Sequence, residues 1–283
     1  MREHAKGIIY KLLAMSLRAS NAERGEGKLR KLLVQSVPDL SKQYTTYEID
    51  SPYATENLRC VHAFQVGLIL KTLKLLNQDS ASRDITVVDI GDSSGTHLKY
   101  LKSVVATNKL NWQLKLLSVN LDPVAVSKIR EQGLDAIECR AERLAEKGIS
   151  ADIFLSFAML EHLFDPISFL HDIASKTDCS YFAITVPYVR SSRVGMQYLR
   201  KGDLRDSSAE DVHIFELSVE DWKLIFRFSG WEVVFEDIYL QSPRFGLLRA
   251  TKPIWSQLDY EGFYGVILRR NPEAAEKYKS WPA

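Results

Sequence analysis

An apolar run that passes through a glycine-spaced turn into a helix constrains this fold more than any other feature of the sequence. Residues 87–90 have the composition of a buried strand, Gly91 and Gly95 bracket a short polar turn, and a helical pattern opens at Thr96. Glycine permits a tight turn and a close backbone approach to a ligand, and the first turn of a helix presents unpaired N–H groups. The segment therefore predicts a nucleotide-type pocket in an α/β protein.

The spacing of these glycines narrows the class of ligand. A dinucleotide site has the spacing Gly-x-Gly-x-x-Gly, which places an anionic pyrophosphate on the helix N-terminus. Here the spacing is Gly-x-x-x-Gly, and the carboxylates of Asp89 and Asp92 stand beside the turn. Two acids favour a cationic or zwitterionic ligand over pyrophosphate, so a nicotinamide dehydrogenase is the weakest interpretation.

Strands and helices alternate along the chain after this turn. Hydrophobic period and cap residues predict strands at residues 113–121, 134–139, 153–157 and 181–186, the last ended by Pro187, and helices at residues 123–131 and 167–175. Such alternation implies a parallel sheet whose ligands bind at the carboxyl edge. The functional residues are therefore expected where the strands end.

From about Ile85 to Arg270 the chain resembles class I S-adenosylmethionine-dependent methyltransferases. The first motif of that family is an acid, one residue and Gly-x-Gly-x-Gly, and Ser93 replaces its middle glycine here. The most specific match is the segment SFAMLEHLFDP at residues 156–166, which resembles the fourth motif of the small-molecule branch. The order of the motifs supports the resemblance more than any single one; the later matches are HIFEL at 213–217, LIFRFSGWEVV at 224–234 and GFYGVILRR at 262–270.

The resemblance implies a fold and a division of the chain. The fold is a Rossmann-like, seven-stranded and mostly parallel sheet with an antiparallel last strand, helices on both faces and extra N-terminal helices. Residues 1–80 are expected to form a helical extension or lid. Residues 81–283 are expected to form the methyltransferase domain, with an insertion at residues 189–212.

The resemblance also implies S-adenosylmethionine as cofactor and places its binding residues. Besides Ser93, two further positions depart from the family's pattern: Asn120 stands where an acid usually accepts the ribose hydroxyls, and Arg140 stands where an Asp is often found near the adenine amine. Asp122, two residues after Asn120, is expected to compensate for the missing ribose acid through a backbone shift. The full set of expected cofactor contacts is Asp89, Gly91, Asp92, Ser93, Gly95, Asn120, Leu121, Asp122, Ala141, Glu142, Ser156 and Phe157.

Two histidines are the candidate catalytic residues. Methyl transfer mainly requires alignment of the acceptor, and a hydroxyl acceptor benefits from a general base with a pKa near neutrality. His162 follows the fourth predicted core strand, and His213 follows the insertion. A capping His162 bonded to the backbone and a structural His213 are the alternatives. The insertion is either a basic lid or a solvated connector; its cations are Arg190, Arg193, Arg200, Lys201 and Arg205.

The N-terminal segment carries apolar residues at helical spacing beside basic ones. Lys11 interrupts the apolar run, which argues against a signal peptide. The helix suits a cover for the domain's own sheet or a dimer contact better than the membrane-surface contact through residues 1–20 that its basic face also allows. A further helix is predicted to start at Ser51-Pro52. Its Tyr53, Arg59 and His62 are expected to pack or to approach the cofactor.

Composition limits the remaining classes of function. Lys and Arg number 37 against 36 Asp and Glu, so the net charge of +1 selects neither nucleic acid nor membrane, and no Asn-Pro-Pro-Tyr-like motif of nucleic-acid methylation follows the fourth predicted core strand. The three cysteines lack metal-ligand spacing, which predicts reduced thiols, no metal site and a cytoplasmic location. No apolar run reaches about 18 residues, which argues against a transmembrane helix.

Two functions from different classes follow. The favoured one is an S-adenosylmethionine-dependent methyltransferase that acts on a hydroxyl or amine of a small molecule, such as a sugar or a lipid-linked metabolite. The alternative is a catalytically inactive methyltransferase-like binding or scaffold subunit, which the departures at Ser93, Asn120 and Arg140 motivate.

Overall fold

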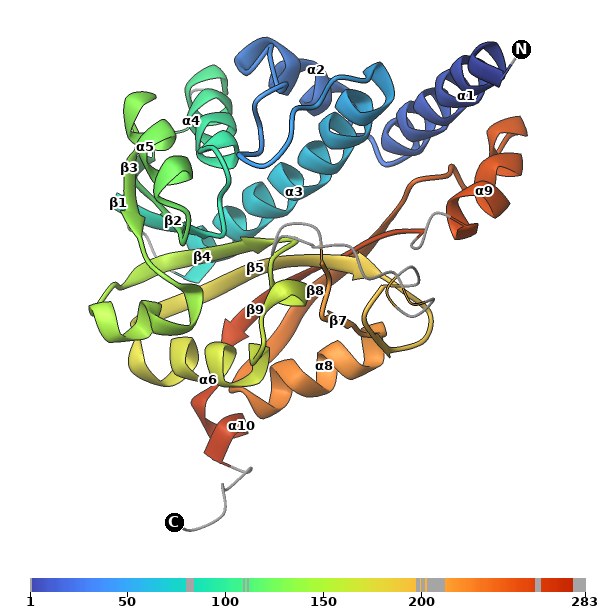
Figure 1. The fold of residues 1–283 in the computed structure, drawn as a ribbon. Helices are drawn as coiled ribbons and strands as arrows, with labels where there is room; N and C mark the ends of the chain where they lie inside the picture. Colours follow the sequence, from blue (N-terminus) through green and yellow to red (C-terminus); the bar gives the residue numbers. More distant parts are fainter. Residues whose placement is uncertain are drawn as a thin grey trace.

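The computed structural model describes residues 2–79, 84–108, 110, 112–196, 199, 202, 212–257 and 261–276. Within these residues one sheet has seven strands in the order β3-β2-β1-β4-β5-β9-β8 (Figure 1). Its strands are β1 (Asp84–Ile90), β2 (Gln113–Asn120), β3 (Asp135–Glu138), β4 (Ala151–Phe157), β5 (Cys179–Tyr188), β8 (Trp231–Leu240) and β9 (Gly262–Arg270). A separate small pair joins β6 (Arg193–Val194) to β7 (Phe215–Glu216).

The strand directions confirm the predicted fold class. Strands β3, β2, β1, β4 and β5 pair in parallel, whereas β9 is antiparallel to both β5 and β8. The chain moves outward from β1 through β2 to β3 and then returns to β4 on the other side of β1. The strand order therefore reverses between β1 and β4, which is where open α/β sheets bind ligands.

Helices cover both faces of the sheet (Figure 1). Helices α3, α4 and α5 pack on one face, and α6 and α8 pack on the other. The helices are α1 (Arg2–Glu23), α2 (Gly27–Ser36), α3 (Pro52–Asp79), α4 (Thr96–Thr107), α5 (Pro123–Glu131), α6 (Pro166–Lys176), α8 (Val219–Phe228), α9 (Lys252–Gln257) and α10 (Pro272–Glu276). Short 3₁₀ turns are η1 (Ala141–Lys147), η2 (Leu160–His162) and η3 (Leu247–Thr251).

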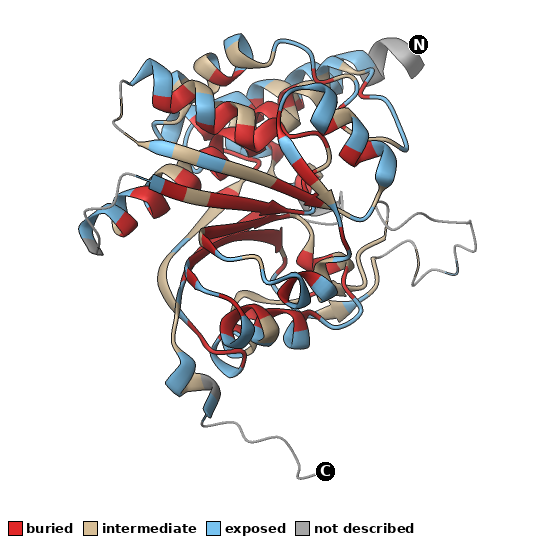
Figure 2. Ribbon diagram, turned by 90° about the vertical axis from the view of Figure 1, so that its left-hand side faces the viewer, coloured by how far each residue is buried: buried red, intermediate tan, exposed pale blue. Residues whose placement is uncertain are grey.

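The central strands are apolar on both faces because each face is covered by helices. Val87 belongs to the core under α3 and α4, and its neighbour Val88 belongs to the core under α6, because successive strand residues point to opposite sides. Figure 2 shows the strands in the middle of the molecule as almost wholly buried. This explains why the sequence shows continuous apolar runs there instead of alternation.

Helix α3 lies unusually close to the sheet at one point. A Cβ at Gly265 on β9 would collide with the ring of Phe64 on α3. On the same helix Gln65 donates a hydrogen bond of 3.1 Å to the hydroxyl of Thr185 on β5. The predicted cap is also present, since the Ser51 hydroxyl accepts from the Ala54 N–H at 3.1 Å. This helix thus connects the N-terminal region to the middle of the sheet.

Helix α1 divides into an exposed and a packed half. Ile8 and Ile9 are exposed, whereas Leu13 and Leu17 are buried beside residues of α3. The Ser16 hydroxyl donates to the backbone carbonyl of Gln241 at 3.0 Å. The second half of α1 therefore covers the protein's own elements, which is one of the predicted roles. No helix in the described part of the chain is long and apolar enough to cross a membrane.

The end of one strand was wrongly predicted at a proline, whereas the other boundaries predicted from residue 113 to residue 181 differ from the structure by at most two residues. Strand β5 does not end before Pro187 but continues to Tyr188, with Pro187 opposite Phe263 on β9. The pairing of β5 with β4 ends at Thr185, so Pro187 has a paired strand on one side only. A proline is tolerated there because its missing N–H can face the unpaired side.

The predicted insertion at 189–212 falls largely outside the described residues. Arg200, Lys201 and Arg205, three of its predicted lid cations, belong to that undescribed part. Arg190 is described, and its guanidinium pairs with Glu261 at 3.0 Å. Arg193 donates to the Glu216 carboxylate at 2.5 Å. The division of the chain at residue 80 stays a prediction, as does closure of the insertion over a substrate.

Candidate functional site

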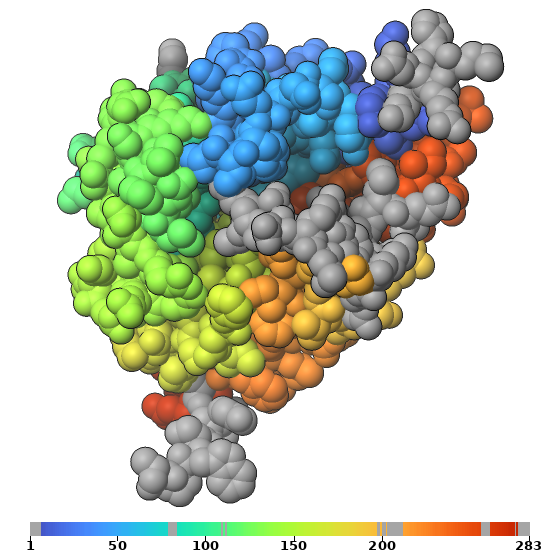
Figure 3. Space-filling model, viewed as in Figure 1, coloured from blue at the N-terminus to red at the C-terminus, as the bar shows by residue number. Residues whose placement is uncertain are grey.

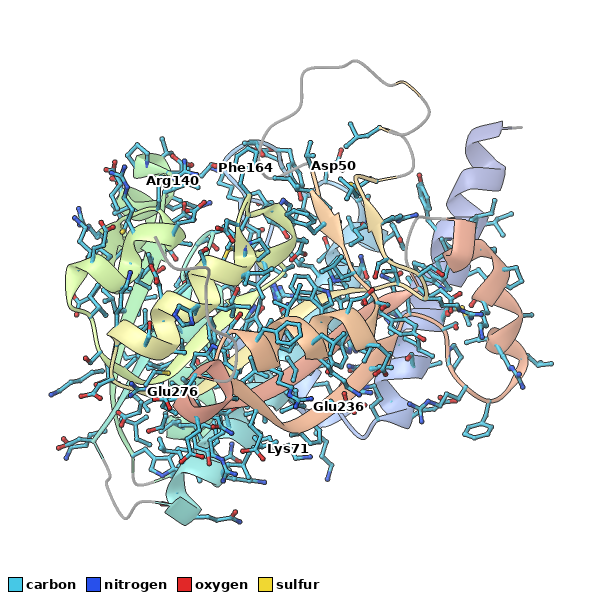
Figure 4. The ribbon with its side chains drawn as sticks, turned by 90° about the horizontal axis from the view of Figure 1, so that it is seen from below. Asp50, Lys71, Arg140, Phe164, Glu236 and Glu276 are labelled. Carbon is cyan, nitrogen blue, oxygen red and sulfur yellow. The ribbon has the colours of Figure 1, made fainter. Side chains whose placement is uncertain are left out.

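Polar residues gather at the carboxyl edge of the sheet. Gly91 follows β1, Asn120 ends β2, and Arg140 and Ala158 come directly after β3 and β4. Figure 4 shows Arg140 and Phe164, from the segments after β3 and β4, along one side of the molecule, with Glu276 and Lys71 on the opposite side. The predicted concentration of polar groups at one edge is confirmed for these strands.

The turn after β1 depends on both of its glycines. Gly91 has φ +84° and Gly95 has φ +72°, a left-handed region that disfavours other residues. A Cβ on Gly91 would lie 2.6 Å from Met159 Cγ, and a Cβ on Gly95 would lie 2.6 Å from Leu134 Cδ1. The glycines therefore provide both a strained backbone conformation and close packing, as their spacing predicted.

Asp92 organises the turn from inside. Its carboxylate accepts hydrogen bonds from the N–H groups of Gly95 at 2.8 Å and Ser94 at 3.2 Å, and from the Ser118 hydroxyl at 3.0 Å. Burial, and after it the nearby Asp89 carboxylate, raise the pKa of Asp92 to about 7, against the lowering effect of His97 and the two N–H groups. Asp92 thus holds the turn closed through its hydrogen bonds.

A pH dependence of stability follows from Asp92. Because its folded pKa of about 7 lies above the ordinary 3.8, its contribution is fully present below about pH 4 and is lost as the pH rises through 7. Asp92→Asn keeps acceptors for the two N–H groups and a donor for Ser118. We expect the variant to match the wild type at pH 4 and to exceed it by about 2 kcal/mol at pH 8.

Urea unfolding followed by circular dichroism at both pH values measures this difference. Glu26 and Glu161 also have pKa values raised by burial to about 7, so both proteins lose stability with pH and only the difference between them reports Asp92. Equal curves for the two proteins would refute the assignment.

The carboxylate of Asp89 lies in a buried polar cluster at the switch point between β1 and β4. The His97 Nδ1 atom lies 3.3 Å from Asp89 Oδ2, while its Nε2 atom hydrogen-bonds the Gln65 side chain at 2.9 Å. Within the described residues, Asp89 Oδ2 nevertheless lacks a partner in hydrogen-bond geometry, and so does the buried hydroxyl of Ser156 on β4. Buried polar atoms without partners are costly, which marks this place as one where a polar ligand is favoured.

The N-terminal region supplies a residue that the sequence analysis missed. Gln43 is buried, donates to the Ser93 hydroxyl at 2.9 Å and accepts from the hydroxyls of Ser94 at 3.0 Å and Thr96 at 2.7 Å. Figure 3 shows the blue N-terminal part lying against the green residues that follow β2. Gln43 lies in a loop without periodicity, so no local pattern predicts its role.

The predicted ribose and adenine positions make local contacts. The Asn120 amide donates to the Asp92 carbonyl at 2.9 Å, and its oxygen accepts from the Asp122 N–H at 2.7 Å. Asp122 caps α5 by accepting from the Val124 N–H at 2.8 Å. Leu121 is exposed, Ala141 and Glu142 open η1, and Arg140 pairs with Glu142 at 3.2 Å. The roles of these residues toward a cofactor stay predictions.

The turn after β4 helps to bring a second set of polar side chains together. Ala158 has φ +51°, so the backbone of this turn is strained, and its N–H donates to the Thr185 carbonyl at 2.8 Å. The sequence did not predict this turn. Glu161 follows, fully buried, and burial raises its pKa to about 7, while the charge of His213 lowers it. The rings of His162 and His213, the two predicted catalytic residues, meet edge to face with centroids 4.9 Å apart.

The described contacts of helix α3, which was expected to pack or to approach the cofactor, are mainly packing contacts. Arg59 is buried, donating to the Tyr100 hydroxyl at 2.8 Å and the Pro38 carbonyl at 2.7 Å. His62 is buried with its ring against His97, and Tyr53 stacks on Trp255. The packing interpretation of these three residues agrees with their contacts. Phe157, a predicted cofactor contact, is also buried and lies edge to face with His97 at 4.9 Å.

Comparison with known proteins gives matches in structure alone. No protein-family model and no curated protein matches the sequence. A protein assigned as a sarcosine dimethylglycine methyltransferase from Galdieria sulphuraria has 13% identity, with 78% of this chain and 87% of that chain covered and a TM-score of 0.52. The chain has the class I methyltransferase fold. At this identity the likeness concerns the methyltransferase fold and not the substrate.

Two further solved structures have lower TM-scores. An S-adenosylmethionine-dependent methyltransferase from Mesorhizobium loti is 14% identical, covering 70% of this chain and 96% of that chain, with a TM-score of 0.48. The 1,6-didemethyltoxoflavin-N1-methyltransferase of Burkholderia thailandensis, solved with 1,6-didemethyltoxoflavin and S-adenosylhomocysteine, is 13% identical. That match covers 80% of this chain and 94% of that chain, with a TM-score of 0.48.

Proposed function

We propose that this protein is an S-adenosylmethionine-dependent methyltransferase acting on a hydroxyl or amine of a small molecule. One observation carries the proposal: a left-handed glycine turn with two buried acids, Asp89 and Asp92, sits at the switch point of a sheet with the methyltransferase order. Acids at a helix N-terminus disfavour a phosphate and favour a ligand with a cationic centre.

The residues of the turn fit that cofactor. Asp89 and Ser156 each offer a buried polar atom without a hydrogen-bond partner among the described residues, and the glycine backbone allows a ligand to approach. Gln43 and Met159 lie against the turn, and both have flexible side chains that can turn aside. The bound cofactor would supply a methyl group on a sulfonium. Asp89 and Ser156 would orient it, while Asn120 and Asp122 would meet the ribose.

The substrate that accepts the methyl group would bind on the side of the glycine turn toward β5. His162 and His213 stand after β4 and before β7, and either imidazole can take a proton from a hydroxyl or ammonium group held beside it. A cavity of about 600 Å³ opens between the end of β5 and α8, a size suited to a small molecule. It is lined by charges of both signs, among them Arg190, Lys223, Arg244, Glu220, Glu236 and Asp237. The described residues that line it include neither histidine and no residue of the glycine turn, so this cavity does not identify the acceptor.

Titration calorimetry with S-adenosylmethionine and S-adenosylhomocysteine tests the cofactor. We expect micromolar binding by the wild type and a loss of at least about 100-fold, roughly 3 kcal/mol, in Asp89→Ala, which removes a buried carboxylate from the cofactor site. Asp135→Ala is the matched control, because that carboxylate is exposed at the start of β3. It should bind like the wild type.

Absence of binding by a folded wild-type protein would contradict the proposal. The inactive binding or scaffold subunit would then be the better interpretation, with Ser93, Asn120 and Arg140 as its explanation. Binding by the wild type, unchanged in Asp89→Ala, would retain the cofactor but overturn the placement of this residue. The absence of nucleic-acid binding, the minor role of membrane contact and the cytoplasmic location stay predictions.

A further inference from the structure

Three side chains of metal-ligand type converge after β4. One ligand atom each from Glu161, His162 and His213 lies within 4.8 Å of the others. Three ligands on one zinc-type ion, at bond lengths of about 2 Å, lie roughly 3.4 Å apart. Small side-chain rotations would therefore bring these ligand atoms from within 4.8 Å of one another to the roughly 3.4 Å that one ion requires. The sequence analysis predicted no metal site from the spacing of the cysteines, and Glu161 and His213 are too far apart along the chain for a local pattern to join them.

The Glu161 carboxylate needs a partner that the described side chains do not provide. It is fully buried, and neither of its carboxylate oxygens has a hydrogen-bond partner in the described part of the chain, although its backbone carbonyl accepts from the Ile214 N–H at 2.7 Å. A buried carboxylate without hydrogen bonds carries a large desolvation cost, which an adjacent cation offsets. The backbone bond to Ile214 fixes this carboxylate next to the segment that carries His213.

Both histidines have the second contacts that metal-bound imidazoles usually have. His162 Nδ1 lies 2.8 Å from the Val212 carbonyl oxygen, and His213 Nδ1 lies 2.7 Å from Glu216 Oε1. An acceptor at Nδ1 keeps the proton on that nitrogen and directs the lone pair of Nε2 to the other side of the ring. Arg193 contacts the other oxygen of Glu216 and holds this carboxylate in place.

We propose that Glu161, His162 and His213 form a binding site for one divalent transition-metal ion of the zinc type. Two imidazoles and one carboxylate match the ligand set of catalytic zinc, which leaves a fourth position open. Magnesium is disfavoured because it prefers oxygen ligands and retains its water.

The open position gives the ion a chemical role that rests on the proposed methyltransferase function. A hydroxyl bound to a zinc-type ion has a lowered pKa and loses its proton more readily. The site lies after β4, next to the acceptor side of the glycine turn. His162 and His213 would then act as ligands that hold the acceptor's oxygen, in place of acting as free bases.

Cobalt binding tests the site without any need for activity. Purified protein treated with chelator is titrated with Co²⁺ alone, and its visible d–d absorption and bound metal are measured. We expect one equivalent per chain with a tetrahedral-type spectrum, and competition by Zn²⁺. Glu161→Gln and His162→Ala should each weaken binding by at least about 100-fold, since even loss of an outer contact costs 10–100-fold.

Two variants serve as references for these losses. Glu216→Gln, which alters the contacts to His213 and Arg193 but none of the three proposed ligands, should weaken Co²⁺ binding by about 10-fold. His171→Ala, which removes an exposed histidine of α6, should bind like the wild type. Thermal unfolding of each variant checks that it is folded; a folded Glu161→Gln keeps the test valid if His162→Ala is not.

The outcomes separate this inference from the proposed function. A folded wild type that takes up no Co²⁺ or Zn²⁺, or binding that survives Glu161→Gln, would overturn the metal site. Co²⁺ binding in a protein that fails to bind S-adenosylmethionine would support the metal site and reject the methyltransferase proposal. Cofactor binding without Co²⁺ binding would support the methyltransferase proposal and overturn the metal site.

Discussion

Trp231→Ala is expected to lower the free energy of unfolding by about 4 kcal/mol, the range for large aromatic residues removed from a core. Trp231 begins β8 and is 1% exposed, with its indole N–H donating to the Leu170 carbonyl at 2.9 Å. Its ring lies edge to face with Phe182 on β5, at 5.6 Å between centroids. Alanine would leave a cavity between α6 and the sheet and remove the indole donor of the Leu170 carbonyl.

Two matched variants separate these contributions. Trp231→Phe fills most of the space but leaves the Leu170 carbonyl without its donor, so we expect a loss of about 1–2 kcal/mol. Leu247→Ala removes a side chain that is 96% exposed and should stay within about 0.5 kcal/mol of the wild type. Urea unfolding followed by circular dichroism gives the three values. A loss below about 1 kcal/mol for Trp231→Ala would contradict the packing described here.

Gly262→Ala is expected to cost about 3 kcal/mol, at the upper end for overpacking in a core. Gly262 opens β9 opposite Leu240 on β8, and its backbone is not left-handed. An added Cβ would collide with the carbonyl oxygen of Tyr239 and lie 2.9 Å from its carbonyl carbon. Since the obstacle is backbone, no side-chain rotation can relieve it, and the two strands must move apart.

Gly27→Ala is the control for the glycine substitution. Gly27 begins α2 with nothing within 4 Å of an added Cβ, so alanine there should be neutral or slightly stabilising. The midpoints of thermal unfolding of both variants can be compared directly. Equal midpoints for Gly262→Ala and the wild type would show that β8 and β9 can separate at little cost.

The edge of the sheet was predictable because local chemistry specifies it. The glycines at 91 and 95 need a left-handed backbone, and the Ser51-Pro52 and Asp122-Pro123 pairs cap the helices that follow them. Each of these signals acts within a few residues, so the sequence alone displays it. Pro187 was misjudged because its tolerance depends on where the neighbouring strand stops.

The contents of the candidate site were predictable only in part. The histidines at 162 and 213 were found as ionisable groups next to strand ends, but their meeting depends on a turn at Ala158 and on the Ile214 bond to Glu161. Gln43 reaches the glycine turn from a loop that shows no periodicity. Contacts of this kind join residues far apart in the chain, which a local pattern cannot report.

The sequence by itself determined the order and type of the elements and the position of the glycine turn, because hydrophobic period and backbone preference are local properties. Only the tertiary structure decided which buried polar groups lack partners, as with Asp89 and Glu161. It also decided which side chains converge, since His162 and its partner Val212 are 50 residues apart in sequence. Burial and convergence depend on how the sheet and its covering helices pack together, and that information is distributed over the whole chain.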